Sequence, residues 1–81
     1  MILNKIKSTE KIVRMIEAEN ILVFETSMKT TKTEIKNEFE KVFNVKVESV
    51  NTYIRKNKKY AYIRLKPQFR AVDIATKLGL M

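Results

Sequence analysis

The sequence predicts an α+β fold, a small sandwich in which helices pack on a three-stranded, mostly antiparallel sheet. Two observations predict it. Apolar residues at helical spacing alternate along the chain with short runs of strand formers, in the order α-β-α-β-β-α. A strand–helix–strand crossover normally places its strands parallel, so a following hairpin can return between them, the split β-α-β arrangement. A short extra N-terminal strand is compatible with this fold. A chain of 81 residues is expected to form one domain, residues 1–81.

The first predicted helix and strand lie between residues 8 and 24. Ser8 or Thr9 can cap the helix, which ends near Asn20. Its apolar side chains recur at helical spacing: Ile12, Met15 and Ile16. Residues 21–24 are apolar and rich in strand formers, and the run is too short for a helix, so we expect a buried strand. Residues 25–30 are the expected connection.

The second helix has the clearest pattern. Thr31 and Glu34 form a capping box, with a hydroxyl at the cap and a carboxylate three residues later. An amphipathic stripe follows: Ile35, Phe39, Val42 and Phe43. Asn44 should end the helix, because asparagine tolerates the left-handed backbone conformation found at helix ends.

A hairpin and a last helix complete the prediction. Residues 45–54 read as a strand whose alternation changes parity, so we expect a bulge near residues 48–50. Residues 56–58 are the predicted turn. In the strand 59–66, Ala61, Ile63 and Leu65 face one way, and Tyr60, Tyr62, Arg64 and Lys66 face the other. The last helix is marked by Ala71, Ile74, Ala75 and Leu78, with Gly79 closing it.

Composition excludes several classes of function. The chain has no cysteine and no histidine, which removes thiolate metal sites, disulfides and Ser-His or Cys-His nucleophiles. No carboxylate pair has an evident apolar pocket, and one glycine cannot supply a phosphate loop. No apolar run reaches the ~18 residues of a membrane span. We therefore predict a cytoplasmic protein that is no enzyme, has no cofactor or metal, and neither enters a membrane nor binds a small-molecule substrate.

Positive charge is concentrated in one part of the chain. Residues 49–72 contain no acidic side chain and seven cations, out of a net charge of +8. Basic and acidic residues nearly cancel elsewhere. A surface kept merely for solubility is better served by mixed signs, so an acid-free run favours a polyanionic partner.

The candidate binding residues lie mainly on the predicted hairpin. Its tip supplies four cations: Arg55, Lys56, Lys58 and Lys59. Tyr60 and Tyr62 are placed either to stack on bases, with Arg64 beside them for phosphate, or to pack beneath a helix. Asn51 and Thr52 either bind a 2′-hydroxyl or phosphate or close the bulge. On the second helix, Lys32 and Lys36 form either an anion site with the first-turn amides or a solvated face.

Several blocks, in order, resemble the large-subunit ribosomal protein 23 family, in a short archaeal-type form. The blocks are residues 8–11, 33–36, 43–47, 50–52, 59–65 and 73–80. The family implies binding to large-subunit ribosomal RNA (rRNA) at the rim of the polypeptide exit tunnel, beside neighbouring ribosomal proteins. It also implies a docking surface for nascent-chain factors such as signal recognition particle, with Glu10 at the position that docks factors in bacterial members. No homo-oligomer is expected.

The resemblance also bears on individual positions. Thr31, Lys32, Lys36, Asn51 and Thr52 match positions that face RNA in the family. Bacterial members carry a long basic loop between the last two strands, whereas about five residues join them here, so a tunnel-probing role is not expected.

Two other functions compete with this interpretation. Residues 58–65 lie close to the aromatic-strand motif of RNA-recognition motif domains, which suggests a single-strand RNA-binding module. Lys59 replaces the glycine of that motif, and that fold has a further strand after its last helix. The second alternative is a protein-interaction module whose basic run meets an acidic partner.

Overall fold

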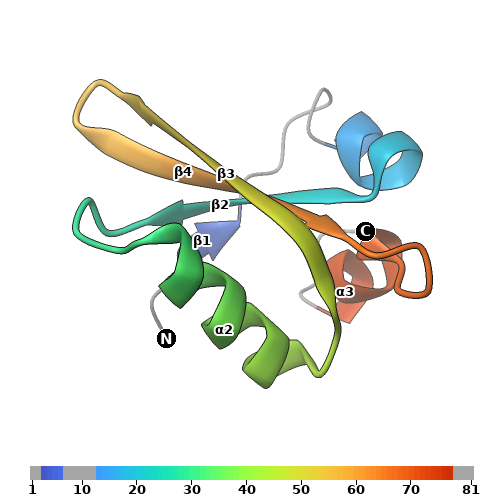
Figure 1. Cartoon of the computed structure of the whole chain (residues 1–81). Helices are drawn as coiled ribbons and strands as arrows, with labels where there is room; N and C mark the ends of the chain where they lie inside the picture. The colour runs from blue at the N-terminus through green and yellow to red at the C-terminus, as the bar shows by residue number, and fades with distance from the viewer. Residues whose placement is uncertain (1–2, 7–12, 78–81) are drawn as a thin grey trace.

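The computed structural model describes residues 3–6 and 13–77. They form a four-stranded sheet in the order β1-β2-β4-β3 (Figure 1). The elements are β1 (Leu3–Ile6), a π-helical turn η1 (Met15–Glu19), β2 (Ile21–Thr26), α2 (Lys32–Phe43), β3 (Val47–Arg55), β4 (Lys58–Leu65) and α3 (Ala71–Lys77). None of the described helices is both long and apolar enough to cross a membrane.

The predicted fold class is confirmed. β4 pairs antiparallel with both β2 and β3, so β2 and β3 run in the same direction on either side of it. This is the split β-α-β arrangement, with α2 as the crossover. The short extra N-terminal strand is present as β1, antiparallel to β2 at the sheet edge.

One face of the sheet carries the hydrophobic core. Leu22 and Phe24 of β2 face the same way as Ala61 and Ile63 of β4, their partners across the ladder, and all four are buried. η1, α2 and α3 contribute to the same core cluster. The face on which α2 and α3 pack is called the helix face below. The opposite one is called the open face because α2 and α3 do not cover it, although Ile21 and Val23 of β2 are buried there. Figure 1 shows α3 and the β3–β4 turn at opposite ends of the sheet.

The first helix ends where the sequence predicts, at Asn20, which adopts a left-handed φ of 60°. Residues 13–14 are helical, and the turn that follows is π-helical, which the sequence did not indicate. Ile16 is buried in the core as expected. The predicted caps, Ser8 and Thr9, lie outside the described residues.

The capping box and end of α2 are confirmed. Thr31 Oγ1 accepts a hydrogen bond from the Glu34 amide at 3.2 Å, and the Glu34 carboxylate accepts one from the Thr31 amide at 3.2 Å. Asn44 ends the helix with a φ of 54°. The predicted apolar stripe is too wide by one residue, because Val42 is 47% exposed. Phe43, also predicted, does continue the stripe, its ring centroid 4.6 Å from that of Phe39.

The β3–β4 hairpin has the predicted bulge and a tighter turn than expected. The register shifts between Val47 and Ser49, which reconciles the two parities of the strand. The turn consists of Lys56 and Asn57, with φ of 50° and 63°. Two left-handed residues match the right-handed twist of the flanking strands. Lys58, predicted to lie in the turn, is the first residue of β4.

The last helix forms as predicted from Ala71, and Ala71, Ile74 and Ala75 are buried. Its predicted end, Leu78 and Gly79, lies outside the described residues.

Candidate nucleic-acid interface

A side-chain hydrogen bond ties the hairpin to the start of α2. The Lys59 ammonium donates to the backbone carbonyl of Thr30, the buried residue that precedes the helix cap. Lys59 itself stands between Thr26 of β2 and Ile54 of β3 in the ladder. The hairpin tip and the N-terminus of α2 therefore meet at one end of the sheet.

This end of the molecule is rich in exposed cations. Arg55 and Lys58 lie directly opposite each other across the hairpin, and Lys56 occupies the turn between them. Like charges placed opposite one another in a ladder are destabilising unless an anion is bound nearby. Lys32 and Lys36, exposed in the first turns of α2, add to the same end. We call these residues, with Lys59, the basic end: Lys32, Lys36, Arg55, Lys56, Lys58 and Lys59.

The capping box limits what the N-terminus of α2 can offer an anion. The carboxylate of Glu34 already accepts hydrogen bonds from both the amide and the hydroxyl of Thr31. The Thr31 hydroxyl oxygen in turn accepts a hydrogen bond from the Glu34 backbone amide. A phosphate at this end would thus be held mainly by the Lys32 and Lys36 side chains.

Asn51 and Thr52 lie on opposite faces of the sheet. Asn51 is exposed and pairs with Tyr62 on the open face, whereas Thr52 is half-buried and pairs with Ala61 on the helix face. Although they are neighbours in the sequence, their side chains point to opposite faces and cannot bind the same group of a ligand. The predicted residues therefore belong to two surfaces that share the hairpin.

The open face carries three tyrosines. Tyr60 and Tyr62 point away from the core on β4 and are half-buried, and Tyr53 stands opposite Tyr60 on β3. The ring centroids of Tyr53 and Tyr62 are 4.9 Å apart at an interplanar angle of 73°. Neither α2 nor α3 covers Tyr60 and Tyr62, because these helices lie on the other face. Met15 of η1, however, lines a hollow beside Tyr62. Tyr53, 57% exposed, was missed by the sequence analysis, although it shares the parity of Asn51.

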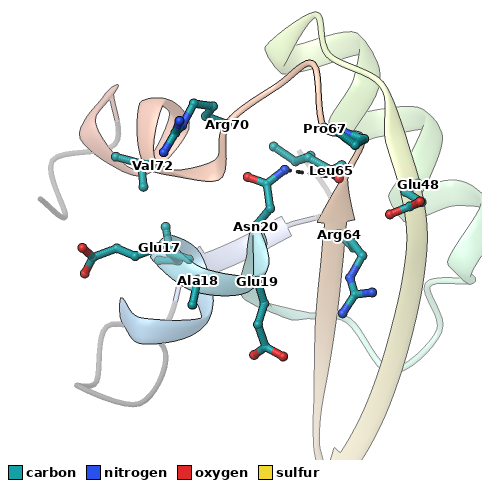
Figure 2. A pocket seen from close by; sticks show the side chains of 11 residues that line it. Glu17, Ala18, Glu19, Asn20, Glu48, Arg64, Leu65, Pro67, Arg70 and Val72 are labelled. Atoms are coloured by element: carbon teal, nitrogen blue, oxygen red, sulfur yellow. Dashed lines mark hydrogen bonds between the residues drawn. The ribbon is translucent and has the colours of Figure 1, made fainter.

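Arg64 lies apart from the basic end. It is six residues along β4 from Lys58, or roughly 20 Å at ~3.3 Å per residue. There it lines a hollow of about 470 Å³ between η1, β4 and the start of α3 (Figure 2). The hollow also carries Glu17, Glu19, Glu48 and Arg70, so its charges are mixed. A polyanion is not specifically favoured in it.

Two expectations fall outside these surfaces. Glu10 lies outside the described residues. Within residues 3–6 and 13–77, no group of three acidic side chains is close enough to hold a metal ion.

A model of the family described as Ribosomal protein L23 matches residues 1–74. The chain belongs to this family. One relative, the large ribosomal subunit protein uL23 of the archaeon Methanococcus aeolicus, is 45% identical over 73 residues, which cover 89% of this chain and 85% of the relative. The resemblance noted in the sequence is thereby confirmed.

Membership of the L23 family establishes the general function of the chain. The chain is a structural protein of the large ribosomal subunit, and it works on the cytoplasmic ribosome with rRNA and ribosomal proteins as its partners. The hairpin turn consists of only two residues, Lys56 and Asn57. There is therefore no long loop between β3 and β4, as the sequence predicted.

Proposed function

We propose that the chain binds large-subunit rRNA near the polypeptide exit tunnel through its basic end, and that it helps form the docking site for nascent-chain factors such as signal recognition particle. The role is structural rather than catalytic. The observation that supports the RNA contact most is the bond from Lys59 to Thr30, because it joins the cations of the hairpin and of α2 into one surface.

Charge and geometry favour an RNA backbone at the basic end. Phosphate contacts from lysine and arginine position a protein on nucleic acid and release condensed counterions. The cations lie on α2, on both strands of the hairpin and in its turn, and they occupy both faces of the hairpin, as a phosphate backbone passing around the tip would need. Thr52 and Asn51 supply neutral hydrogen-bonding groups three and four residues along β3 from Arg55, one on each face.

The test is the salt dependence of binding to large-subunit rRNA. Replacing Lys56, Lys58 and Lys59 by alanine should weaken binding and flatten the slope of log K against log salt by up to roughly 2–3 units. Because Lys59 also bonds Thr30, the double variant Lys56→Ala, Lys58→Ala separates charge from that bond. It should lose up to about 2 units.

A matched control removes three cations from the other end of the molecule. Lys66, Arg70 and Lys77 are exposed and lie around α3. Replacing all three by alanine lowers the net charge equally and should leave the slope close to that of the wild type. Equal losses for the two triple variants would show that binding follows net charge, and an unchanged slope for the hairpin variant would refute the assignment.

A second candidate is a single-strand RNA-binding module. The placement of Tyr60 and Tyr62 on the open face favours it, because stacking onto bases requires ring surface that α2 and α3 leave uncovered. Titration with short single-stranded oligonucleotides distinguishes the two functions. Tight binding that does not depend on RNA structure would favour the module, whereas weak binding beside tight binding to folded rRNA would favour the ribosomal contact.

The factor-docking part of the proposal depends on Glu10. Its support is the resemblance of residues 8–11 to the N-terminal signature of the family, in which the matching glutamate takes part in docking.

A further inference from the structure

A second, smaller hollow lies on the open face of the sheet, apart from the basic end, and it shares Arg64 with the larger hollow of mixed charge. Its volume is about 340 Å³. In the described part of the chain its walls come from η1 and three neighbouring strands: Met15, Ile21, Asn51, Tyr53, Tyr62 and Arg64. Small-molecule sites usually measure ~300–1,000 Å³, so this one suits a single small ring system rather than a larger ligand.

The backbone register explains why these side chains converge. Ile21 and Arg64 are partners across β2 and β4, and Asn51 and Tyr62 are partners across β3 and β4. Arg64 and Tyr62 are two residues apart on one strand, so they share its open face. Met15 reaches the same place as the first residue of the π-helical turn, a feature frequent at functional sites.

The lining consists of apolar walls and two polar side chains that have no hydrogen-bond partner among the described residues. Met15, Ile21 and the two tyrosine rings provide the apolar surface, with Tyr53 and Tyr62 in edge-to-face contact. Among the described residues, neither the side-chain amide of Asn51 nor the guanidinium of Arg64 has a hydrogen-bond or ion-pair partner. An amide offers both a donor and an acceptor, and a guanidinium offers donors to an anion.

These features together describe the ligand. It must be flat enough to lie against tyrosine, must carry donors and acceptors on its edge for Asn51, and must place negative charge near Arg64. A nucleotide meets all three requirements. Bases inside a duplex have both faces covered by their neighbours, so the base that enters must be unpaired.

We propose that this hollow takes one unpaired base of large-subunit rRNA, with its phosphate on Arg64. The inference rests on the proposed function and adds to it a base-recognition site distinct from the phosphate contacts of the basic end. The open face connects the two sites, because Lys58 and Arg55 at the tip share it with Tyr62 and Tyr53. RNA backbone leaving the hollow along β4 would therefore run towards the cations.

The experiment compares two RNA hairpins that differ by one nucleotide. One is fully paired, and the other carries a single bulged 2-aminopurine, whose fluorescence reports stacking. We expect the bulged RNA to bind about tenfold more tightly, as stacking of one base on an aromatic side chain would give. The Met15 and Ile21 methyl signals of the protein should shift on binding the bulged RNA and move less with the paired one.

Variants separate the hollow from the basic end. Tyr53→Ala should abolish the preference for the bulged RNA, and Tyr53→Phe should keep it, because the ring alone is needed. The double variant Lys56→Ala, Lys58→Ala should weaken binding of both hairpins equally and leave their ratio unchanged.

The outcomes also separate this inference from the proposed function. Equal affinities for the two hairpins, with the methyl signals unmoved and the salt slope intact, would overturn base capture alone. Failure of both hairpins and of folded rRNA to bind would overturn the proposed function, and base capture with it.

Discussion

Replacing Asn20 by glycine removes an amide that joins the end of η1 to β4 and to the start of α3. Its Nδ2 donates to the carbonyl of Phe69 at 2.7 Å and to that of Leu65 at 3.2 Å. Its Oδ1 accepts from the backbone amide of Ala71 at 2.6 Å, at the first residue of α3. Figure 2 shows this side chain pointing from η1 into the space between β4 and α3.

The size of the effect follows from these bonds and from the backbone of Asn20. The side chain also donates to the Lys66 carbonyl, at a longer 3.4 Å. The three shorter hydrogen bonds, at about 1 kcal/mol each, predict a loss of roughly 2–3 kcal/mol for Asn20→Gly. Glycine keeps the left-handed φ of 60° without strain, whereas alanine does not. Asn20→Ala should therefore cost about 1 kcal/mol more than Asn20→Gly.

The assay is urea or thermal unfolding of the purified chain. For a domain of this size, Asn20→Gly should lower Tm by about 4–8 °C for each kcal/mol lost. Asn44 is the matched control, because it has a φ of 54° but is exposed and its amide makes no hydrogen bond among the described residues. Asn44→Gly should be near neutral, and Asn44→Ala should cost about 1 kcal/mol.

The reasoning would be refuted by a particular pattern. If Asn20→Gly unfolds within about 0.5 kcal/mol of the wild type, the side-chain bonds contribute nothing net, and the left-handed backbone alone explains the residue. If Asn44→Gly is as harmful as Asn20→Gly, the loss reflects glycine in general.

Two further predictions concern Thr31 and Glu10. Thr31→Ala should lower the free energy of unfolding by about 1 kcal/mol, because the Glu34 amide loses its acceptor. Thr31→Ser keeps the hydroxyl and should keep the stability of the wild type. Glu10→Lys should leave rRNA binding unchanged and alter the affinity of ribosomes for signal recognition particle. Failure of the Glu10 variant to enter the large subunit would instead make Glu10 a partner of the helix N-terminus.

The sequence predicted what depends on neighbours along the chain. The capping box of α2 involves residues three apart, and the alternation of β4 follows from the pleat, so both could be read directly. The bulge in β3 was visible because the apolar parity changes between Val47 and Val50.

What the sequence could not predict depends on distant residues. Lys59 and Thr30 are 29 positions apart, and Asn20 lies 51 positions from Ala71. Neither bond has a local signal. The role of Tyr53 was also hidden, because its partners on β4 depend on the register that the bulge and the turn set together.

Cross-linking in assembled large subunits tests the basic end most directly. A benzophenone amino acid in place of Asn57 puts a photoreactive group in the turn of the hairpin, and the same group in place of exposed Thr76 puts it on α3 at the other end. The account predicts that the probe at position 57 cross-links to rRNA more efficiently than the probe at position 76. Cross-links from position 57 to protein alone, with rRNA reached from position 76, would contradict it.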